Sequence, residues 1–315
     1  MAYITGTAAT FADLQTALQN ACTANGWTLS SGILSKNGCF FQLVAGTSDG
    51  YAQLQLFGGT GQSGTTLTGQ PPSNYGAKIC SNNGNVIAFP INYEIHLFTN
   101  PDEVYCVINY NSDFYQQISF GKSDVPGIGG TGAWFTGAYH STTDLTTADS
   151  SMLYWRASVW SAGVSKQLAQ TVGLFAHANN SGSRQASFVH AGLDSVGWKT
   201  AENETAGTGL QGMSYASGLL TAMPNLGNNA NVLIPVKAIQ FRFDNGRTVV
   251  ANPRNVRYMR IDNVVPGEII TFGTERWKCY PFHRKNATVR DGVDWYSGGA
   301  RHSGTWGYAI KYTGS

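Results

Sequence analysis

The sequence predicts a mainly β protein with a minor α part. Glycine makes up 38 of the 315 residues, and charged residues make up only 12% of the chain, about half of what soluble domains usually carry. Short apolar–polar alternations recur along the chain, and turn-forming sequences separate them. We expect an N-terminal helix packed on an antiparallel sheet over residues 1–125, a loop-rich middle over 126–230, and a compact β unit over 231–315.

The segment TFADLQTALQNACTANGW is the clearest helix. Apolar residues recur along it at helical spacing, at Phe11, Leu14, Leu18 and then Ala21 or Cys22. Thr10 can cap its start with Asp13 three residues on, and Asn25-Gly26 ends it.

Several antiparallel strands should accompany this helix. A hairpin is expected over residues 27–36, and strands over 39–45 and 51–57 flank a strong turn signal at residues 47–50. Residues 86–99, 103–110 and 114–121 should form a three-stranded meander, in which Pro90 predicts an edge or a bulge in the first strand. Residues 58–85 are polar and glycine-rich, which predicts a loop.

The hairpin YCVINYNSDFYQQISFGKS raises a question, because it places five aromatic rings on both faces of a sheet. One face can cover the helix, and the other face needs a second partner. Our hypothesis is that one face makes the core and the other makes a subunit interface. Tyr105, Phe114 and Tyr115 are therefore candidate interface residues.

The middle region holds further candidate aromatics. Residues 121–144 have the composition of a long ordered loop, and residues 152–163 of a strand, while residues 197–231 have weak periodicity. Aromatic residues gather around the glycine-rich stretches, where they can stack on sugar rings or anchor a subunit interface, and we favour the interface. These candidates are Trp134, Phe135, Tyr139, Trp155 and Trp160.

The C-terminal part returns to short strands, at residues 232–243, 248–251, 256–262, 268–273, 275–282 and 306–312. From Lys237 onward the chain has 13 Lys and Arg against 6 Asp and Glu, whereas the first 236 residues have 7 against 12. Such asymmetry can mark a nucleic-acid face. The basic residues form no run, so we favour ion pairs between the two parts, within a subunit or between neighbours.

Signatures of catalysis and of cofactor binding do not emerge. The glycine runs at 58–64 and 129–132 lack the Lys-Ser/Thr ending of a phosphate-binding loop. The six histidines have no metal-ligand spacing, no GxSxG motif occurs, and the acid pair Asp102-Glu103 is interpreted as solvated. We expect no enzyme activity, no cofactor and no metal.

The five cysteines predict a protein folded in a reducing cytosol. They are odd in number, widely spaced and without a CxxC motif, so buried free thiols are expected. No signal peptide is recognised, and no apolar run is long enough to span a membrane.

Both ends of the chain resemble virion structural proteins of tailed bacteriophages encoded in the tail gene region. The C-terminal stretches are NVRYMRIDNVVPGEIITFGTERWKCYPFHRKN and HSGTWGYAIKYTGS, and the N-terminal ones are FADLQTALQNACTANGWTLSSGILSKNG and EVYCVINYNSDFYQQISFG. The resemblance implies a tail tip or baseplate subunit that assembles in the host cytoplasm, with copies of itself and other phage tail proteins as partners. It carries no catalytic or binding residues. We expect a symmetric homo-oligomer.

Three other functions stay open. The chain could be a tail adhesin for host attachment, binding a cell-surface glycan through middle-region aromatics such as Trp134. It could instead decorate the head or neck, where the basic C-terminal part would meet DNA, although nucleic-acid contact is the less expected outcome. A depolymerase or peptidoglycan hydrolase comes last.

Overall fold

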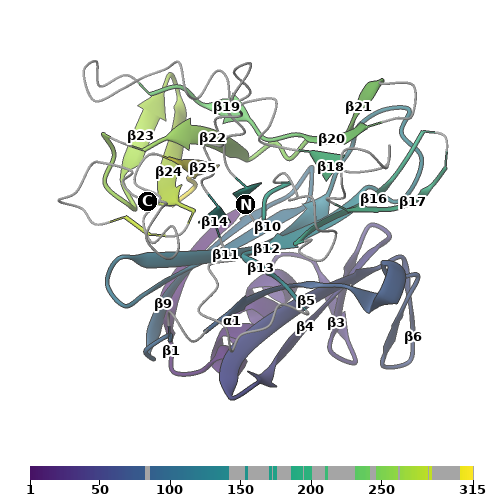
Figure 1. Ribbon diagram of the computed structural model, residues 1–315, viewed down its shortest axis with the longest axis horizontal. Coiled ribbons are helices and arrows are strands. Elements are labelled where there is room, and N and C mark those ends of the chain that lie inside the picture. The colour runs from purple at the N-terminus through teal and green to yellow at the C-terminus, as the bar shows by residue number, and fades with distance from the viewer. Residues whose placement is uncertain are drawn as a thin grey trace, which may run out of the picture.

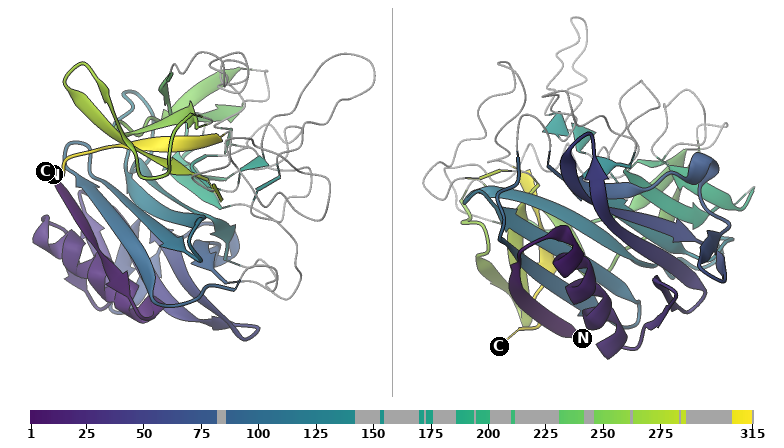
Figure 2. Two further views of the ribbon diagram at one scale, coloured as in Figure 1. Left: turned by 90° about the vertical axis from the view of Figure 1, so that its left-hand side faces the viewer. Right: turned by 90° about the horizontal axis from the view of Figure 1, so that it is seen from below.

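The computed structural model stacks three β layers, with one α-helix in its described part (Figures 1 and 2). The mainly β fold class is confirmed. The described residues are 1–81, 86–141, 153–154, 170–171, 173–175, 186–193, 195–200, 210–211, 231–241, 246–261, 263–282, 284–285 and 306–314.

The central layer is a seven-stranded antiparallel sheet, here called the middle sheet. In spatial order its strands are β1 (Ala2–Ala8), β9 (Ile91–Phe98), β10 (Glu103–Tyr110), β11 (Phe114–Lys122), β12 (Ala133–Gly137), β16 (Ser187–Ala191) and β17 (Gly197–Thr200). The predicted meander is present as β9, β10 and β11. The edge or bulge predicted from Pro90 is wrong, because Pro90 lies just before β9, and β9 pairs in regular register with β1 on one side and β10 on the other.

A six-stranded lower sheet packs against one face of the middle sheet. Its spatial order is β13 (Tyr139–His140), β8 (Ala77–Cys80), β5 (Tyr51–Gly59), β4 (Cys39–Ser48), β3 (Ile33–Lys36) and β2 (Thr28–Ser30). The turns of its two predicted hairpins have positive φ angles at Ser31 and Gly32 and at Asp49 and Gly50, as tight hairpin turns require. The predicted loop 58–85 in fact contains β8 and a small hairpin of β6 (Gly61–Ser63) and β7 (Thr66–Thr68), besides the 3₁₀ turn η1 (Pro72–Asn74).

The third layer is a five-stranded C-terminal sheet. Its spatial order is β19 (Ile234–Pro235), β22 (Val256–Arg260), β25 (Trp306–Lys311), β24 (Glu275–Pro281) and β23 (Ile269–Phe272). A three-stranded sheet of β18 (Leu210–Gln211), β20 (Ala238–Phe241) and β21 (Arg247–Ala251) lies beside it, and β14 (Leu153–Tyr154) pairs with β15 (Gln170–Thr171).

Helix α1 (Phe11–Ala24) has the ends that the sequence predicts. The Thr10 hydroxyl oxygen accepts a hydrogen bond from the Asp13 backbone N–H at 3.1 Å, and Gly26 follows with a φ of +84°. The predicted apolar stripe is buried, and it packs beside β1 and β9 of the middle sheet and β4 and β5 of the lower sheet (Figure 1). The helix therefore closes one end of the space between these two sheets.

Strand β12 corrects the predicted loop at residues 121–144. All five of its residues are buried, so the strand lacks the apolar–polar alternation by which strands are usually recognised. After Ala138 the chain continues into β13 of the lower sheet, so one short segment links the two layers. A Cβ atom on Gly137 would lie 3.0 Å from the Lys78 backbone, and this close approach explains the glycine at the crossing.

The expected boundary at residue 125 falls between two hydrogen-bonded strands. β11 pairs with β12 from Ile118↔Gly137 to Lys122↔Ala133, so the N-terminal and middle segments share one sheet. One hydrophobic cluster runs from Ala8 to Ile310 through all three layers, and a second, smaller cluster lies in the C-terminal part.

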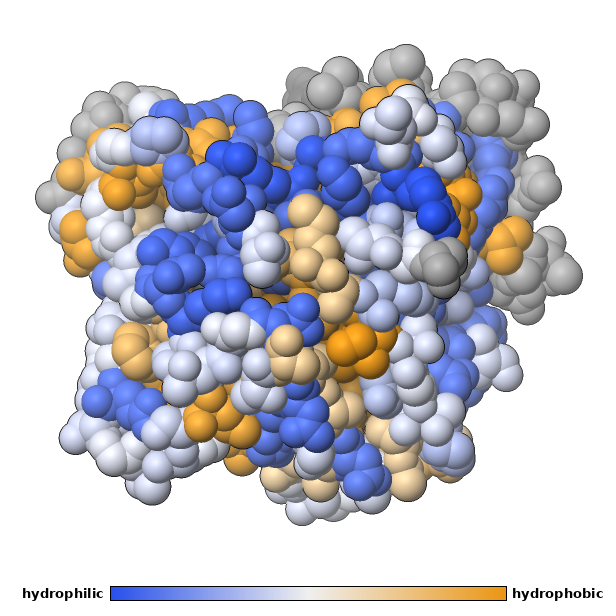
Figure 3. Space-filling model, turned by 180° about the vertical axis from the view of Figure 1, so that it is seen from behind, coloured by the Kyte–Doolittle hydropathy of each residue, from blue (hydrophilic) through white to orange (hydrophobic). Residues whose placement is uncertain are grey.

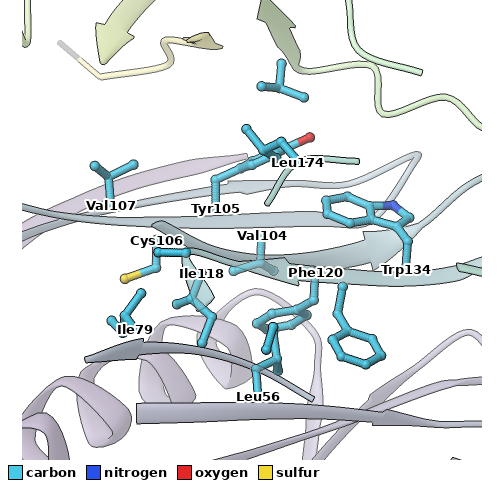
Figure 4. Packing of buried hydrophobic residues seen from close by; sticks show 14 of the residues in the cluster. Leu56, Ile79, Val104, Tyr105, Cys106, Val107, Ile118, Phe120, Trp134 and Leu174 are labelled. Atoms are coloured by element: carbon cyan, nitrogen blue, oxygen red, sulfur yellow. The ribbon is translucent and has the colours of Figure 1, made fainter. Parts of the chain in front are cut away.

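The middle sheet is covered on both faces by the chain itself (Figure 4). Val104, Cys106, Ile118 and Phe120 face the lower sheet, where Leu56 and Ile79 meet them, whereas Tyr105, Val107 and Trp134 point to the opposite side. On that side lie Leu174 and the C-terminal sheet, which contributes the buried rings of Tyr258, Tyr280 and Tyr308. The second partner of the aromatic hairpin is therefore the C-terminal part of the same chain.

Candidate functional site

Four of the predicted interface aromatics are core residues of the single chain, which corrects the expectation of a surface role. Tyr105, Trp134, Phe135 and Tyr139 are each at most 1% exposed. Trp134 packs on Tyr105 with ring centroids 5.9 Å apart, and Phe135 stacks on Phe188 at 4.6 Å. Their rings have no surface left for a ligand or a second subunit, and β12, which carries Trp134 and Phe135, is buried on both faces. Trp155 and Trp160 lie outside the described residues.

Phe114 and Tyr115 lie at the tip of the β10–β11 hairpin and are only partly buried. The Arg284 guanidinium stacks 4.5 Å from the centre of the Phe114 ring, and its Nε donates to Asp113 Oδ2 at 2.9 Å. The backbone of Arg284 forms a β-bridge with Phe114. The hairpin tip is thus joined to the segment that follows β24.

A pocket of about 500 Å³ opens at this hairpin tip. The turn residues Asn111, Ser112 and Asp113 form one side together with Tyr115, and the other side comes from the C-terminal part. That second side consists of Val265, Pro266, Arg284 and Lys285. Sequence reasoning singled out the aromatics here but missed the pocket, because its two walls are about 150 residues apart in the chain.

A polar cluster joins the middle sheet to the C-terminal sheet. Glu94 Oε2 accepts hydrogen bonds from the hydroxyls of Tyr3 at 2.6 Å and Tyr280 at 2.7 Å, and the Lys278 ammonium lies 2.6 Å away. Lys278 also donates to Tyr3 Oη at 2.7 Å. Burial alone would raise the pKa of Glu94, but the hydrogen bonds from Lys278, Tyr3 and Tyr280 and the charge of Lys278 together hold it below its ordinary value.

His96 completes this cluster as a neutral side chain. It is fully buried, and its Nε2 lies 2.8 Å from Tyr280 Oη. Because the Tyr280 hydroxyl proton is donated to Glu94, the proton between His96 and Tyr280 belongs to His96 Nε2. Burial lowers the pKa of His96 to about 3, and Lys278 lowers it further against the opposing effect of Glu94. His96 therefore acts here as a hydrogen-bond donor within the core.

The acid pair Asp102-Glu103 is buried, which corrects its interpretation as solvated. Glu103 is 0% exposed and accepts hydrogen bonds from the backbone N–H groups of Arg254 and Asn255, the Asn255 side chain and the Tyr105 hydroxyl. Burial raises the pKa of Glu103, and these hydrogen bonds offset part of that rise. Asp102 pairs with Lys36 at 2.7 Å. No local pattern indicated this burial, because Arg254 and Asn255, which donate to Glu103, and Lys36, which pairs with Asp102, lie far from the acid pair in the chain.

Three ion pairs link a base of the C-terminal part to an acid of the N-terminal part. They are Lys278–Glu94 at 2.6 Å, Arg284–Asp113 at 2.9 Å and Arg254–Asp124 at 2.5 Å. The predicted meeting of the basic and acidic parts therefore occurs within one chain at these residues. These three ion pairs neutralise part of the excess positive charge that a nucleic-acid-binding face would need.

The second glycine run lines a smaller pocket of about 260 Å³. Gly129 and Gly132 are held by backbone hydrogen bonds to Gly192 and His190, and the Thr131 N–H donates to His190 Nδ1 at 3.1 Å. The backbone groups of this glycine run are therefore occupied by hydrogen bonds that hold it against the end of β16. The arrangement is a loop wrapped around His190.

The five cysteines are all free and buried. Burial raises the pKa of Cys39, Cys80 and Cys106 to about 12, and raises those of Cys22 and Cys279 as well. Within the described part of the chain, no group of three or more His, Cys, Asp or Glu side chains is placed to hold a metal ion. No helix among the described residues is both long and apolar enough to cross a membrane.

No protein-family model matches the chain, and comparison with curated proteins gives no match either. The likeness to phage virion proteins therefore stays a prediction.

Proposed function

We propose that this chain is a non-enzymatic structural subunit of a tailed-bacteriophage virion, located at the tail tip or baseplate and assembled as a symmetric homo-oligomer. The observation that supports the proposal is that polar contacts join the three β layers into one rigid unit. The C-terminal sheet is held to the middle sheet by the Glu94–Lys278 cluster and by the buried Glu103 carboxyl. A rigid unit of this kind presents a surface of constant shape to neighbouring subunits, as assembly into a particle requires.

The low charge supports the same proposal. Only 12% of the residues are charged, whereas a free monomer usually keeps more charge on its surface. Exposed apolar side chains occur on and just before the edge strand β23, at Val265, Ile269 and Phe272. An edge strand with exposed apolar residues is suited to pairing with another chain. On the face seen in Figure 3, hydrophobic side chains form small patches between hydrophilic ones.

Immunogold labelling of intact particles tests the location. An antibody against the purified chain, followed by negative-stain electron microscopy, should place gold at the distal end of the tail. Gold on the head or neck would overturn the tail assignment. Labelling only of disrupted particles would indicate a buried position within the virion, and labelling of neither preparation would remove the chain from the particle.

Sedimentation of the purified chain tests the homo-oligomer. A single species whose mass is a whole multiple of 33.8 kDa is expected at micromolar concentration. A monomer at all concentrations would contradict self-assembly outside the particle.

Trp134 cannot be the contact residue of the glycan-binding alternative, because its ring is fully buried. The open pocket at the β10–β11 tip is the observation that keeps a binding role in consideration.

A further inference from the structure

We propose that the pocket at the tip of the β10–β11 hairpin is a binding site for a neutral saccharide. Its volume of about 500 Å³ falls within the range of small-molecule sites, and it is large enough for one or two sugar rings. The site goes beyond the structural role above and does not depend on it.

The polar side of the pocket offers hydrogen-bonding groups suited to hydroxyls. In the described part of the chain, neither the exposed Ser112 hydroxyl nor the Tyr115 hydroxyl has a hydrogen-bond partner. Each can both donate and accept. Asp113 adds a carboxylate whose Oδ2 is held by Arg284, so its orientation is fixed. Sugar hydroxyls also donate and accept hydrogen bonds. Adjacent hydroxyls on one sugar ring can therefore pair with the Ser112 and Tyr115 hydroxyls and the Asp113 carboxylate.

The opposite wall has an apolar part, formed by Val265 and Pro266 beside Arg284 and Lys285. Val265 is about half exposed and stands beside Pro266 on the turn that precedes β23. The C–H face of a pyranose ring is apolar while its edge carries the hydroxyls, so a ring can lie against this wall with its edge toward Ser112 and Tyr115. A few placed polar groups with an apolar wall are typical of small-molecule sites.

The charges favour a neutral ligand. Asp113 and Arg284 form an ion pair, and the Lys285 ammonium is buried and donates to the Ile261 carbonyl oxygen. The bond to Ile261 does not cancel the Lys285 charge, but that side chain is only 2% exposed, and the more accessible cation of the lining, Arg284, is already paired with Asp113. An acidic sugar would add a negative charge next to the Asp113 carboxylate, which opposes binding.

The site is rigid before a ligand arrives. Asn111 and Ser112 have φ angles of +46° and +72°, and the Asn111 side chain bonds to the Val86 carbonyl oxygen at 2.7 Å and the Ala88 N–H at 3.0 Å. The Arg284 guanidinium stacked on Phe114 fixes the other side. A preformed site loses little entropy on binding.

Saturation-transfer difference NMR on the full-length chain tests the proposal. The probes are the methyl glycosides of glucose, galactose, mannose and N-acetylglucosamine, with galacturonate as the acidic comparison and glycerol as the small polyol. At least one neutral glycoside should give a saturable signal with a dissociation constant on the order of 1–10 mM, as expected for so small a ligand. Galacturonate and glycerol should bind at least fivefold more weakly.

Two variants locate the signal in the pocket. Ser112→Gly removes the hydroxyl and tolerates the positive φ, and Tyr115→Phe removes only the phenolic oxygen. Each should weaken binding at least threefold, and the double variant should abolish it at 10 mM. The matched controls are Ser31→Gly, at a turn residue with a φ of +49°, and Tyr51→Phe on β5, and both should bind like the unchanged chain.

Thermal melts of all variants confirm that the protein is folded during the measurement. The proposal is overturned if no neutral glycoside gives a signal. It is equally overturned if the folded double variant binds as well as the unchanged chain, or if galacturonate binds more tightly than every neutral probe.

Discussion

At the scale of single residues, the side chains that attracted functional interest mostly serve the core. Trp134 and Tyr105 lie on the face of the middle sheet that the C-terminal part covers, and both are at most 1% exposed. Aromatic residues of this size dominate the energetics of a core, as they do of an interface. Composition alone cannot distinguish these two roles, because both require large apolar rings.

Trp134→Ala should act as a stability mutation. We expect a loss of about 3–5 kcal/mol in the free energy of unfolding, because the change leaves a large cavity in the core. Trp134→Phe should cost clearly less, since a ring remains and the buried Trp134 Nε1 has no hydrogen-bond partner among the described residues. Urea denaturation followed by circular dichroism measures both, and a loss below about 1 kcal/mol for Trp134→Ala would contradict the buried placement.

Glu94 should make the free energy of unfolding fall as the pH is lowered. Its pKa is lowered in the folded chain, so it contributes stability above its ordinary pKa of about 4.5 that is lost as the pH falls toward the folded value. Between pH 6 and 3 the unchanged chain should therefore lose more stability than Glu94→Gln. Denaturation at a series of pH values measures this.

Glu275→Gln is the matched control for that titration. Glu275 also has a lowered pKa and also pairs with a lysine, Lys311 at 2.6 Å, but it is largely exposed, and such surface pairs contribute little. This variant should follow the unchanged chain. If the Glu94 and Glu275 variants behave alike, the cluster at Glu94 does not hold the layers together.

At the scale of elements, local chemistry determined the helix and the hairpins. Thr10, the apolar stripe and Gly26 define α1 without help from the rest of the chain, and the hairpin turns carry residues that accept positive φ. β12 and β8 could not be found this way. β12 is buried on both faces among glycines, and β8 buries even Lys78, whose ammonium donates to Gln53 Oε1 at 3.1 Å.

Removal of the helix cap should destabilise the N-terminal part. Thr10→Ala should lower the free energy of unfolding by about 0.5–2 kcal/mol, because the Asp13 N–H loses its acceptor. Thr16→Ala is the control, since this exposed hydroxyl only donates to the Ala12 carbonyl oxygen within the helix. It should change stability by less than about 0.5 kcal/mol, and alanine is the better helix former. Equal losses in the two variants would refute the cap.

At the scale of the whole molecule, the burial of the cysteines reports on the integrity of all three layers. Cys22 lies on α1, Cys39 and Cys80 in the lower sheet, Cys106 in the middle sheet and Cys279 in the C-terminal sheet. Burial raises the pKa of every one of them, so few thiolates form at pH 8.

A thiol-reactive disulfide reagent should therefore modify the native chain very slowly. All five thiols should react once the chain is unfolded in guanidinium chloride. In partial denaturant, mass spectrometry should find the five sites labelled together if the layers unfold as one unit. Early labelling of Cys279 alone would show that the C-terminal sheet opens separately from the others.

The sequence by itself determined the mainly β class, the N-terminal helix, the hairpins and the free buried thiols. Each of these depends on residues close together in the chain, where capping, turn geometry and periodicity act. The aromatic hairpin also correctly indicated that both faces of its sheet would be covered.

Only the tertiary structure decided what covers the second face. The C-terminal part does so, and it brings Lys278 to Glu94, Arg254 to Asp124 and Arg284 to Asp113. The same packing forms the pocket at the hairpin tip and buries Glu103. These contacts join residues more than 100 positions apart, and no local propensity specifies them, because they arise from the burial of apolar area and the pairing of opposite charges across the whole molecule.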